Sequence, residues 1–248
     1  MSAHSPEVGI VVYGASPSRL HRLRRWASAV GAGQSTIIEN KAGAATQGVL
    51  QGDNKHSEFS AYLQLCSLFR GDGPYLIIND TLVRTHWAYG WARLCRKLLR
   101  GKLDEHTIIG DIRNDGDDIA GKPSVYLASW IFIIPSRKAL EAFRAALEQA
   151  LTHPETLPSA YDQWLHRWLN PGSLSGGWHR KAGEAEKRRK RFCIITEHCL
   201  SQQLSPHGLQ MVSAGRFNPA LYFLIRLADR LKTRLSAAIT RLKPASDH

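Results

Sequence analysis

The sequence predicts an α/β fold in which helices flank a mainly parallel sheet. Over roughly the first 150 residues, short apolar runs alternate with longer runs whose apolar residues recur every three or four positions. This alternation is typical of parallel strands joined by helical crossovers. The early apolar runs stop at glycine or at polar residues, where a strand reaches the edge of its sheet.

Five apolar runs are predicted to be strands. They are Val8 to Tyr13, Thr36 to Glu39, Tyr75 to Ile78, Thr107 to Gly110 and Val125 to Ile134. Four runs with helical spacing lie between or after them: Arg19 to Val30, His56 to Phe69, Leu82 to Leu99 and Arg137 to Leu151. Ser16, followed by Pro17, is the expected cap of the first of these helices, and Ser136 the expected cap of the last.

The chain changes character beyond residue 152. We expect a short aromatic helix from Tyr161 to Leu169, a loop rich in proline, glycine and serine over residues 170–177, and a basic run from Lys187 to Arg191. Phe192 to Leu204 is predicted to form a strand and a short helix. A long helix, Leu221 to Leu242, follows near the end.

The protein is strongly basic, with a formal net charge of +12 at pH 7. This charge favours anionic partners, which include nucleic acid, an anionic membrane surface and phosphorylated substrates. Four cysteines occur without a CxxC pair, so a zinc site is not expected. We find no secretory signal and no apolar run long enough to span a membrane, and we expect a cytoplasmic protein with reduced thiols.

Polar side chains close the second and third predicted strands. Glu39 and Asn40 end one, and Asn79 and Asp80 end the other. Acids and amides at the carboxyl ends of strands form ligand sites in open α/β sheets. A carboxylate at Asp80 can also hold a divalent cation. The alternatives are that Asp80 caps the next helix and that Glu39 and Asn40 are turn residues.

Further candidates lie in the loops and strands that follow. Asp53, Asn54 and Glu58 form a polar cluster entering the second helix, where a capping role would account for one of them. Asp111 follows the fourth predicted strand and is either a general base or a turn residue.

Ser129 and Trp130 lie within the last apolar strand. Trp130 is either a platform for a sugar ring or a core residue. Glu197 and His198 form a late acid–imidazole pair, which is suited to proton transfer or metal ligation and has a structural role as its alternative.

The last helix combines apolar and basic residues. Its apolar positions, spaced by three or four, are Leu224, Leu227, Leu231, Leu235, Ile239 and Leu242. Asp229 is the only acid among the basic residues between them. Such a helix can lie on an anionic membrane surface, and the alternative is a helix packed on its own domain.

The order of these segments resembles small bacterial GT-A glycosyltransferases. The resemblance rests on VGIVVY, IIENKAGAATQG and YLIINDT in that order, and then on the strand and helix at residues 126–140. It implies a GT-A-like, Rossmann-like sheet and a nucleotide-sugar donor. The sequence departs from the family at the metal motif, where Asp80 is the only acid, and Arg84 or His86 is a candidate to supply part of the missing cation's charge.

The resemblance also implies roles for the candidate residues. Nucleotide-sugar contacts are expected from Tyr13, Glu39, Asn40, Asp53, Asn54, Asn79 and Asp80. Acceptor contacts are expected from Ser129, Trp130, Glu197 and His198. Asp80 would hold Mn²⁺ or Mg²⁺ if a metal is used. Asp111 is the first choice for the general base, and Glu58 is the second.

We therefore expect a glycosyltransferase that extends a surface polysaccharide, a lipopolysaccharide or another lipid-linked glycan. Residues 1–151 would form the nucleotide-sugar core, residues 152–215 would complete the domain on the acceptor side, and residues 216–248 would form the basic helix that holds the enzyme on the inner face of the cell membrane. The alternatives are a nucleic-acid-binding protein, although no reading motif for a specific nucleic acid is present, and an inactive glycosyltransferase-like scaffold.

Overall fold

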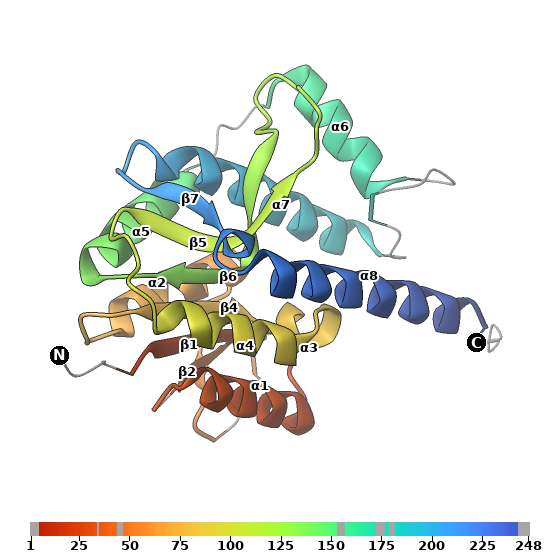
Figure 1. Ribbon diagram of the computed structural model, residues 1–248. Helices are drawn as coiled ribbons and strands as arrows, with labels where there is room; N and C mark the ends of the chain where they lie inside the picture. The colour runs from red at the N-terminus through yellow and green to blue at the C-terminus, as the bar shows by residue number, and fades with distance from the viewer. Residues whose placement is uncertain are drawn as a thin grey trace.

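The computed structural model describes residues 5–33, 35–43, 47–152, 157–171, 177–178 and 182–242, with side chains described up to residue 232. Its centre is a seven-stranded sheet in the order β3-β2-β1-β4-β6-β5-β7 (Figure 1). The strands are β1 (Glu7–Val12), β2 (Ser35–Glu39), β3 (Leu50–Gln51), β4 (Tyr75–Asn79), β5 (Thr107–Asn114), β6 (Val125–Ile134) and β7 (Gln210–Ser213).

Helices cover both faces of this sheet. They are α1 (Pro17–Val30), α2 (Glu58–Leu68), α3 (Thr81–Thr85), α4 (Ala88–Leu99), α5 (Arg137–Ala150), α6 (Ser159–Leu169), α7 (Glu184–Leu204), the 3₁₀ helix η1 (Ala214–Arg216) and α8 (Pro219–Leu242). No helix in the described part of the chain is both long enough and apolar enough to cross a bilayer.

The sheet is mixed but mainly parallel, as predicted. β1 pairs in parallel with β2 and β4, β2 with β3, and β5 with β7. β6 alone among these seven strands is reversed, because it pairs antiparallel with both β4 and β5. This arrangement is compatible with the expected GT-A-like fold.

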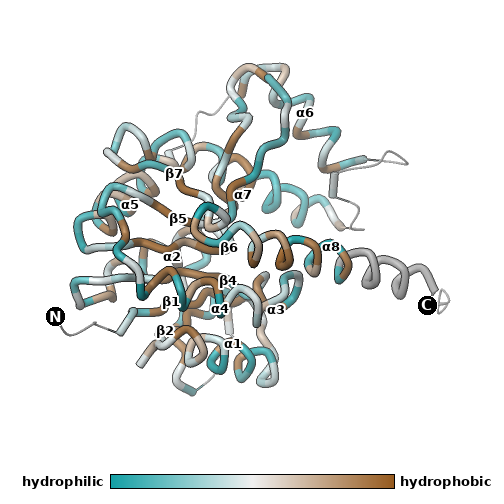
Figure 2. The backbone as a smooth tube through the Cα atoms, viewed as in Figure 1, coloured by the Kyte–Doolittle hydropathy of each residue, from teal (hydrophilic) through white to brown (hydrophobic). Residues whose placement is uncertain are grey.

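Alternation along the strands builds a core on each face. Val8, Ile10 and Val12 of β1 pack with α1 and α4, whereas Val11 packs on the other face with α2, α5 and α7. Gly9 allows α2 to approach β1 closely, since a Cβ at this position would lie 2.6 Å from Leu65 Cδ1. Figure 2 shows hydrophobic residues along the central strands, as a sheet buried on both faces requires.

The strand order reverses at β1. The chain passes from β1 through α1 to β2 on one side, and later enters β4 on the other side through α2. Because α1 and α2 pack on opposite faces, a crevice opens between the carboxyl ends of β1 and β4. Ligands of open α/β sheets bind at this kind of position.

Several predicted elements differ from the structure. The single helix expected from Leu82 to Leu99 is two helices, α3 and α4, separated by His86 and Trp87. The carboxylate of Asp229 on α8 accepts the Trp87 backbone N–H, so the chain turns there instead of continuing one helix. The strand expected after residue 192 is wrong, because those residues continue α7, which already includes the basic run.

The strand containing Asp111 is longer than expected. β5 runs through Asp111 to Asn114, because its last residues, Ile112 to Asn114, pair with the first residues of β6, Val125 to Leu127. Asp111 therefore lies inside a strand and not after one. Two short strands were not predicted, β3 and β7, and both lie at the edges of the sheet, where only one neighbour constrains their sequence.

Candidate functional site

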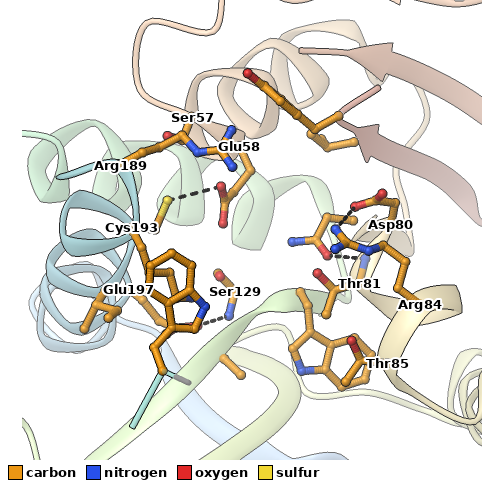
Figure 3. Close-up of a pocket in the computed structure, with 18 of the residues that line it drawn as sticks. Ser57, Glu58, Asp80, Thr81, Arg84, Thr85, Ser129, Arg189, Cys193 and Glu197 are labelled. Atoms are coloured by element: carbon orange, nitrogen blue, oxygen red, sulfur yellow. Dashed lines mark hydrogen bonds and ion pairs between the residues drawn. The ribbon is translucent and has the colours of Figure 1, made fainter. Parts of the chain in front are cut away.

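A cleft of about 640 Å³ lies at the carboxyl ends of β1, β2 and β4. The sheet contributes one wall, and α6 and α7 contribute the other. Of the predicted site residues, the cleft is lined by Tyr13, Asn40, Asn54, Glu58, Asn79, Asp80, Ser129, Trp130, Glu197 and His198. Glu39, Asp53 and Asp111 do not line it. Figure 3 shows Glu58, Cys193 and Glu197 on one side, Asp80 and Arg84 on the other, and Ser129 between them.

Glu39 shapes the cleft without lining it. Its carboxylate accepts the backbone N–H groups of Gly14 at 2.8 Å, Ala15 at 3.2 Å and Lys41 at 2.7 Å. These bonds fix the turn after β1 against the end of β2. Tyr13 directly precedes Gly14, and the guanidinium of Arg189 lies over its ring, 4.4 Å from the ring centroid. This contact joins the turn to α7. Glu39 thus has a positioning role in this structure.

Asn79 is held in one orientation. Its Nδ2 donates to the Tyr62 hydroxyl at 2.9 Å, and its Oδ1 accepts the Thr81 backbone N–H at 3.0 Å. The Tyr62 hydroxyl in turn donates to the Ser129 carbonyl at 2.7 Å. A buried chain of hydrogen bonds therefore connects the end of β4 to the middle of β6, and it sets the distance across the floor of the cleft.

Asp80 is paired with two arginines. Arg19 Nη1 lies 3.0 Å from its Oδ2, and Arg84 Nη1 lies 3.9 Å from its Oδ1. Burial raises the pKa of the Asp80 carboxyl, and the charges of Arg84 and Arg19 oppose that shift. Asp80 occupies the cap position of α3, but its side chain makes no capping hydrogen bond. The ion pairs, and not helix capping, account for this carboxylate.

The surroundings of Asp80 do not fit a metal site. Among the residues that the structure describes, no group of three or more histidine, cysteine, aspartate or glutamate side chains could hold a metal ion. Mn²⁺ and Mg²⁺ require several oxygen ligands, whereas both oxygens of Asp80 face guanidinium groups.

Backbone strain is concentrated beside the cleft. Within the described chain, Asn54 (φ 52°) and Ser57 (φ 53°) are the residues other than glycine with positive φ, and both line the cleft. Asn40 Nδ2 donates to the Ser57 carbonyl, which helps to hold this conformation. Oδ1 of Asn40 and Oδ1 of Asn54 are buried without a hydrogen-bond partner among the described residues. Strain and unpaired acceptors are features of ligand sites.

Two carboxylates line this side of the cleft: Glu197 on α7 and Glu58 on the neighbouring helix α2. Glu58 accepts from the Cys193 thiol at 3.3 Å, a weak donor, and Glu197 accepts the Ser129 backbone N–H. Burial raises the pKa of Glu197, while Lys190, the Ser129 amide and Arg113 oppose the shift. Both carboxylates are placed to accept a proton inside the cleft.

His198 is a neutral partner in this wall. Its Nδ1 lies 2.6 Å from the Tyr161 hydroxyl, and burial lowers its pKa to about 3. An imidazole with this pKa carries no charge near neutral pH, so the structural alternative for His198 fits better than proton transfer. Asp53 lies away from the cleft, on an open hollow next to α2.

Asp111 is fully buried outside the cleft. Its carboxylate accepts from the Tyr222 hydroxyl at 2.8 Å, from Arg226 at 3.0 and 3.1 Å, and from Trp130 Nε1 at 3.2 Å. Arg113 lies 3.4 Å away. These groups occupy the lone pairs of both oxygens, so the geometry does not support Asp111 as the general base. It joins β5 to α8.

Trp130 is part of a stacked wall. Its ring lies 3.9 Å from that of His86 at an interplanar angle of 15°, and Trp91 packs edge-on at 4.8 Å. With one face against His86 and an exposed fraction of 4%, Trp130 presents no open face to a sugar. His86 Nδ1 lies 2.7 Å from Asp229 Oδ2, so α8 holds this wall in place.

Sequence reasoning missed most of the helical wall. The cleft is also lined by Arg113, Tyr126, Trp164, Trp168, Trp178, Arg189, Lys190 and Cys193. Lys190 Nζ lies 5.8 Å from the centroid of the Trp168 ring. Trp164 and Trp168 are four residues apart and therefore share one face of α6, a spacing visible in the sequence. Arg189 and Lys190 belong to the predicted basic run, but the sequence did not show that α7 carries them past the cleft.

Replacing Asp111 tests its structural role. Asp111→Asn removes the charge that Arg226 faces, and breaking a buried ion pair costs about 3–5 kcal/mol. Because Arg226 is partly exposed, we expect the low end, a loss of about 3 kcal/mol in the free energy of unfolding measured with urea. The exposed Asp117→Asn is the control. A variant as stable as the wild type, but without activity, would restore Asp111 as a catalytic candidate.

The raised pKa of Glu197 predicts that the difference in stability between a Glu197→Gln variant and the wild type depends on pH. Because its pKa is raised in the folded protein, its favourable contribution is present below the ordinary glutamate pKa and is lost as pH rises through the raised value. Glu197→Gln removes this loss, so the Tm difference, variant minus wild type, should increase from about pH 4 to about pH 8. Glu141→Gln, on the exposed side of α5, should show no such trend. A difference that falls with pH would contradict the burial of this carboxylate.

Comparisons with known proteins give only a weak structural likeness. No protein-family model matches the chain, and no curated protein matches it. A crystal structure of the apo form of the glycosyltransferase GlyE in Streptococcus pneumoniae TIGR4 matches with a TM-score of 0.33 and 12% identity. The match covers 82% of this chain and 63% of the GlyE chain, so this chain spans less than two thirds of that protein. Function therefore has to be inferred from the cleft itself.

Proposed function

We propose that this protein transfers a sugar from a nucleotide-sugar donor to a glycan or lipid-linked acceptor. One observation carries the proposal: polar residues from the ends of three adjacent parallel strands meet in a single cleft at the point where the strand order reverses. These residues are Tyr13, Asn40, Asn79 and Asp80. Nucleotides bind at this position in open α/β sheets.

The donor half lies over β1, β2 and β4. Tyr13 and Asn40 line this half of the cleft. Arg84, whose side chain is half exposed, reaches the same region from α3, and Arg189 and Lys190 approach from α7. Guanidinium and ammonium groups bind phosphate oxygens strongly, so these residues are suited to hold the diphosphate.

Arginine takes the place of a metal in this proposal. Asp80 pairs with Arg84 and Arg19 instead of coordinating Mn²⁺ or Mg²⁺, and Arg84, which lines the cleft, supplies positive charge where the donor diphosphate would lie. When the bond to the sugar breaks, negative charge develops on the departing phosphate, and fixed cations stabilise it.

Glu58 is the proposed general base. Cys193 is its one hydrogen-bond donor within the described chain, which leaves the carboxylate available to a substrate. The acceptor hydroxyl oxygen would bond to the anomeric carbon, its proton would pass to Glu58, and the bond to the nucleoside diphosphate would break with the electron pair going to the phosphate oxygen. Glu197, on α7, is the alternative base.

The acceptor half lies against α6 and α7. Trp164, Trp168 and Trp178 give it an aromatic lining, and aromatic groups in pockets pack against the apolar faces of ligands. A glycan offers such faces. We therefore propose that the acceptor binds here. The enzyme would act in surface polysaccharide biosynthesis, at the inner face of the membrane.

The structure gives little support to nucleic-acid binding. The basic run at residues 187–191 lies on α7, and two of its five basic residues are paired within the protein. Lys187 binds Asn170 at 2.7 Å and Glu184 at 3.2 Å, and Arg191 binds Asp162 at 2.6 Å.

An inactive scaffold differs from the proposed enzyme in turnover, which the tests below measure.

Nucleotide binding tests the donor half. We expect one of UDP, GDP, CMP and dTDP to raise Tm by roughly 5–10 °C at about 100 times its Kd, with the same shift in Mn²⁺ and in EDTA. Arg84→Met should abolish the shift, whereas Arg93→Met, on the exposed side of α4, should keep it. The absence of a shift with every nucleotide would refute the donor site, and a shift that requires Mn²⁺ would refute the substitution of arginine for the metal.

Catalysis tests the base. With the nucleotide sugar selected by that screen, Glu58→Gln should lower kcat about 10²–10⁴-fold while leaving the nucleotide-induced Tm shift unchanged. Glu141→Gln should turn over like the wild type. Normal turnover by Glu58→Gln with a large loss in Glu197→Gln would transfer the role to Glu197. A wild-type protein that binds the nucleotide but never turns over would be the scaffold.

A further inference from the structure

Four large apolar side chains lie exposed along one face of α8. The exposed fractions are 67% for Phe223, 54% for Leu224, 44% for Leu227 and 51% for Leu231. Their spacing places them in a single stripe, which we call the outer face of α8. Figure 1 shows α8 running outward from the centre of the sheet toward the C terminus, and Figure 2 shows hydrophobic residues in the part of the helix nearest the sheet.

The opposite face of α8 already packs on the domain. Ile225 is fully buried and approaches Gly90 of α4, where an added Cβ would lie 2.9 Å from it. Asp229 binds His86, and Arg226 binds Asp111. These contacts fix the rotation of the helix about its axis. Packing on the domain therefore explains the inner face of α8 and leaves its outer face without a partner among the described residues.

The helix is strongly cationic. Its sequence holds five basic residues, Arg226, Arg230, Lys232, Arg234 and Arg241, and one acid, Asp229, which is buried against His86. Arg230 is exposed beside the apolar stripe. Two aromatic side chains at the start of α4, which packs against α8, are also exposed: Trp87 by 39% and Tyr89 by 73%. Tryptophan and tyrosine favour the boundary between lipid and water.

We propose that the outer face of α8 docks on an anionic phospholipid bilayer. Its leucine and phenylalanine side chains would enter the boundary between headgroups and acyl chains, and the basic residues would pair with anionic headgroups. A second copy of this chain is a poorer partner, because each copy has a net charge of +12 and the approach would bring two cationic helices together. The surface goes beyond the proposed sugar transfer and does not depend on it.

Sedimentation with vesicles tests the docking surface. The full chain should bind vesicles of equal parts phosphatidylglycerol and phosphatidylcholine at about 0.1 M salt, and much less at about 1 M salt or to pure phosphatidylcholine. Phe223→Ser with Leu227→Ser should lower the partition coefficient about tenfold or more, and Arg230→Glu should lower it to a smaller extent. The matched control, Leu50→Ser with Val125→Ser, removes exposed apolar groups elsewhere and should bind like the wild type.

Tm and the nucleotide-induced Tm shift are measured on the same samples, to check the fold and the donor site. The outer-face variants should keep the wild-type Tm and the nucleotide-induced Tm shift, so a failure of docking is separable from a failure of the transferase. Three results would overturn the proposal: no binding of wild type to the anionic vesicles, outer-face variants that bind as well as wild type, or a control that loses as much. A wild-type dimer that the outer-face variants convert to monomer, without vesicle binding, would assign this face to self-association.

Discussion

The buried carboxylate of Asp111 makes the interactions on which the wall formed by His86 and Trp130 depends. Removing a carboxylate from water is costly, and here the cost is offset by Arg226, the Tyr222 hydroxyl and Trp130 Nε1. Two of these three groups come from α8 and the third from the cleft wall. Once α8 is fixed in this way, its Asp229 reaches His86, and His86 stacks on Trp130. One ionised group in β5 thus determines where a helix more than a hundred residues later lies, and through it the shape of the cleft.

The other half of the cleft depends on the turn chemistry at the strand ends. Glu39 holds three backbone amides, Asn40 supports the positive φ of Ser57, and Asn79 is fixed through Tyr62. These polar groups are committed to the protein's own backbone, which keeps the rim in place before a ligand arrives. Pre-organisation of this kind lowers the entropy that binding must overcome. A group that is less committed, such as Glu58, is therefore the better candidate for contact with substrate.

The sequence was sufficient for the sheet and the donor rim. The apolar runs predicted five of the seven strands. Of the polar pairs that follow two of them, Asn40, Asn79 and Asp80 meet in the cleft, because the ends of parallel strands share one edge. It was not sufficient for Asp111, whose partners lie on α8 and are too distant in sequence to be recognised locally. The helical wall was missed for a related reason. Residues 184–204 mix charged, β-branched and small residues without a clear apolar period, and their helix is selected by packing against β6 and α5.

The contact between Asp111 and α8 also limits how this protein can change during evolution. A terminal helix attached only by apolar contacts can be lost or exchanged among relatives with little harm to the remaining domain. Here, deletion of α8 would remove Arg226 and the Tyr222 hydroxyl from the buried Asp111 and leave it with Trp130 Nε1 and Arg113, so the helix cannot behave as a detachable module. Substitutions at positions 111, 222 and 226 should be inherited together, and relatives that lack the helix should carry an apolar residue in the middle of β5.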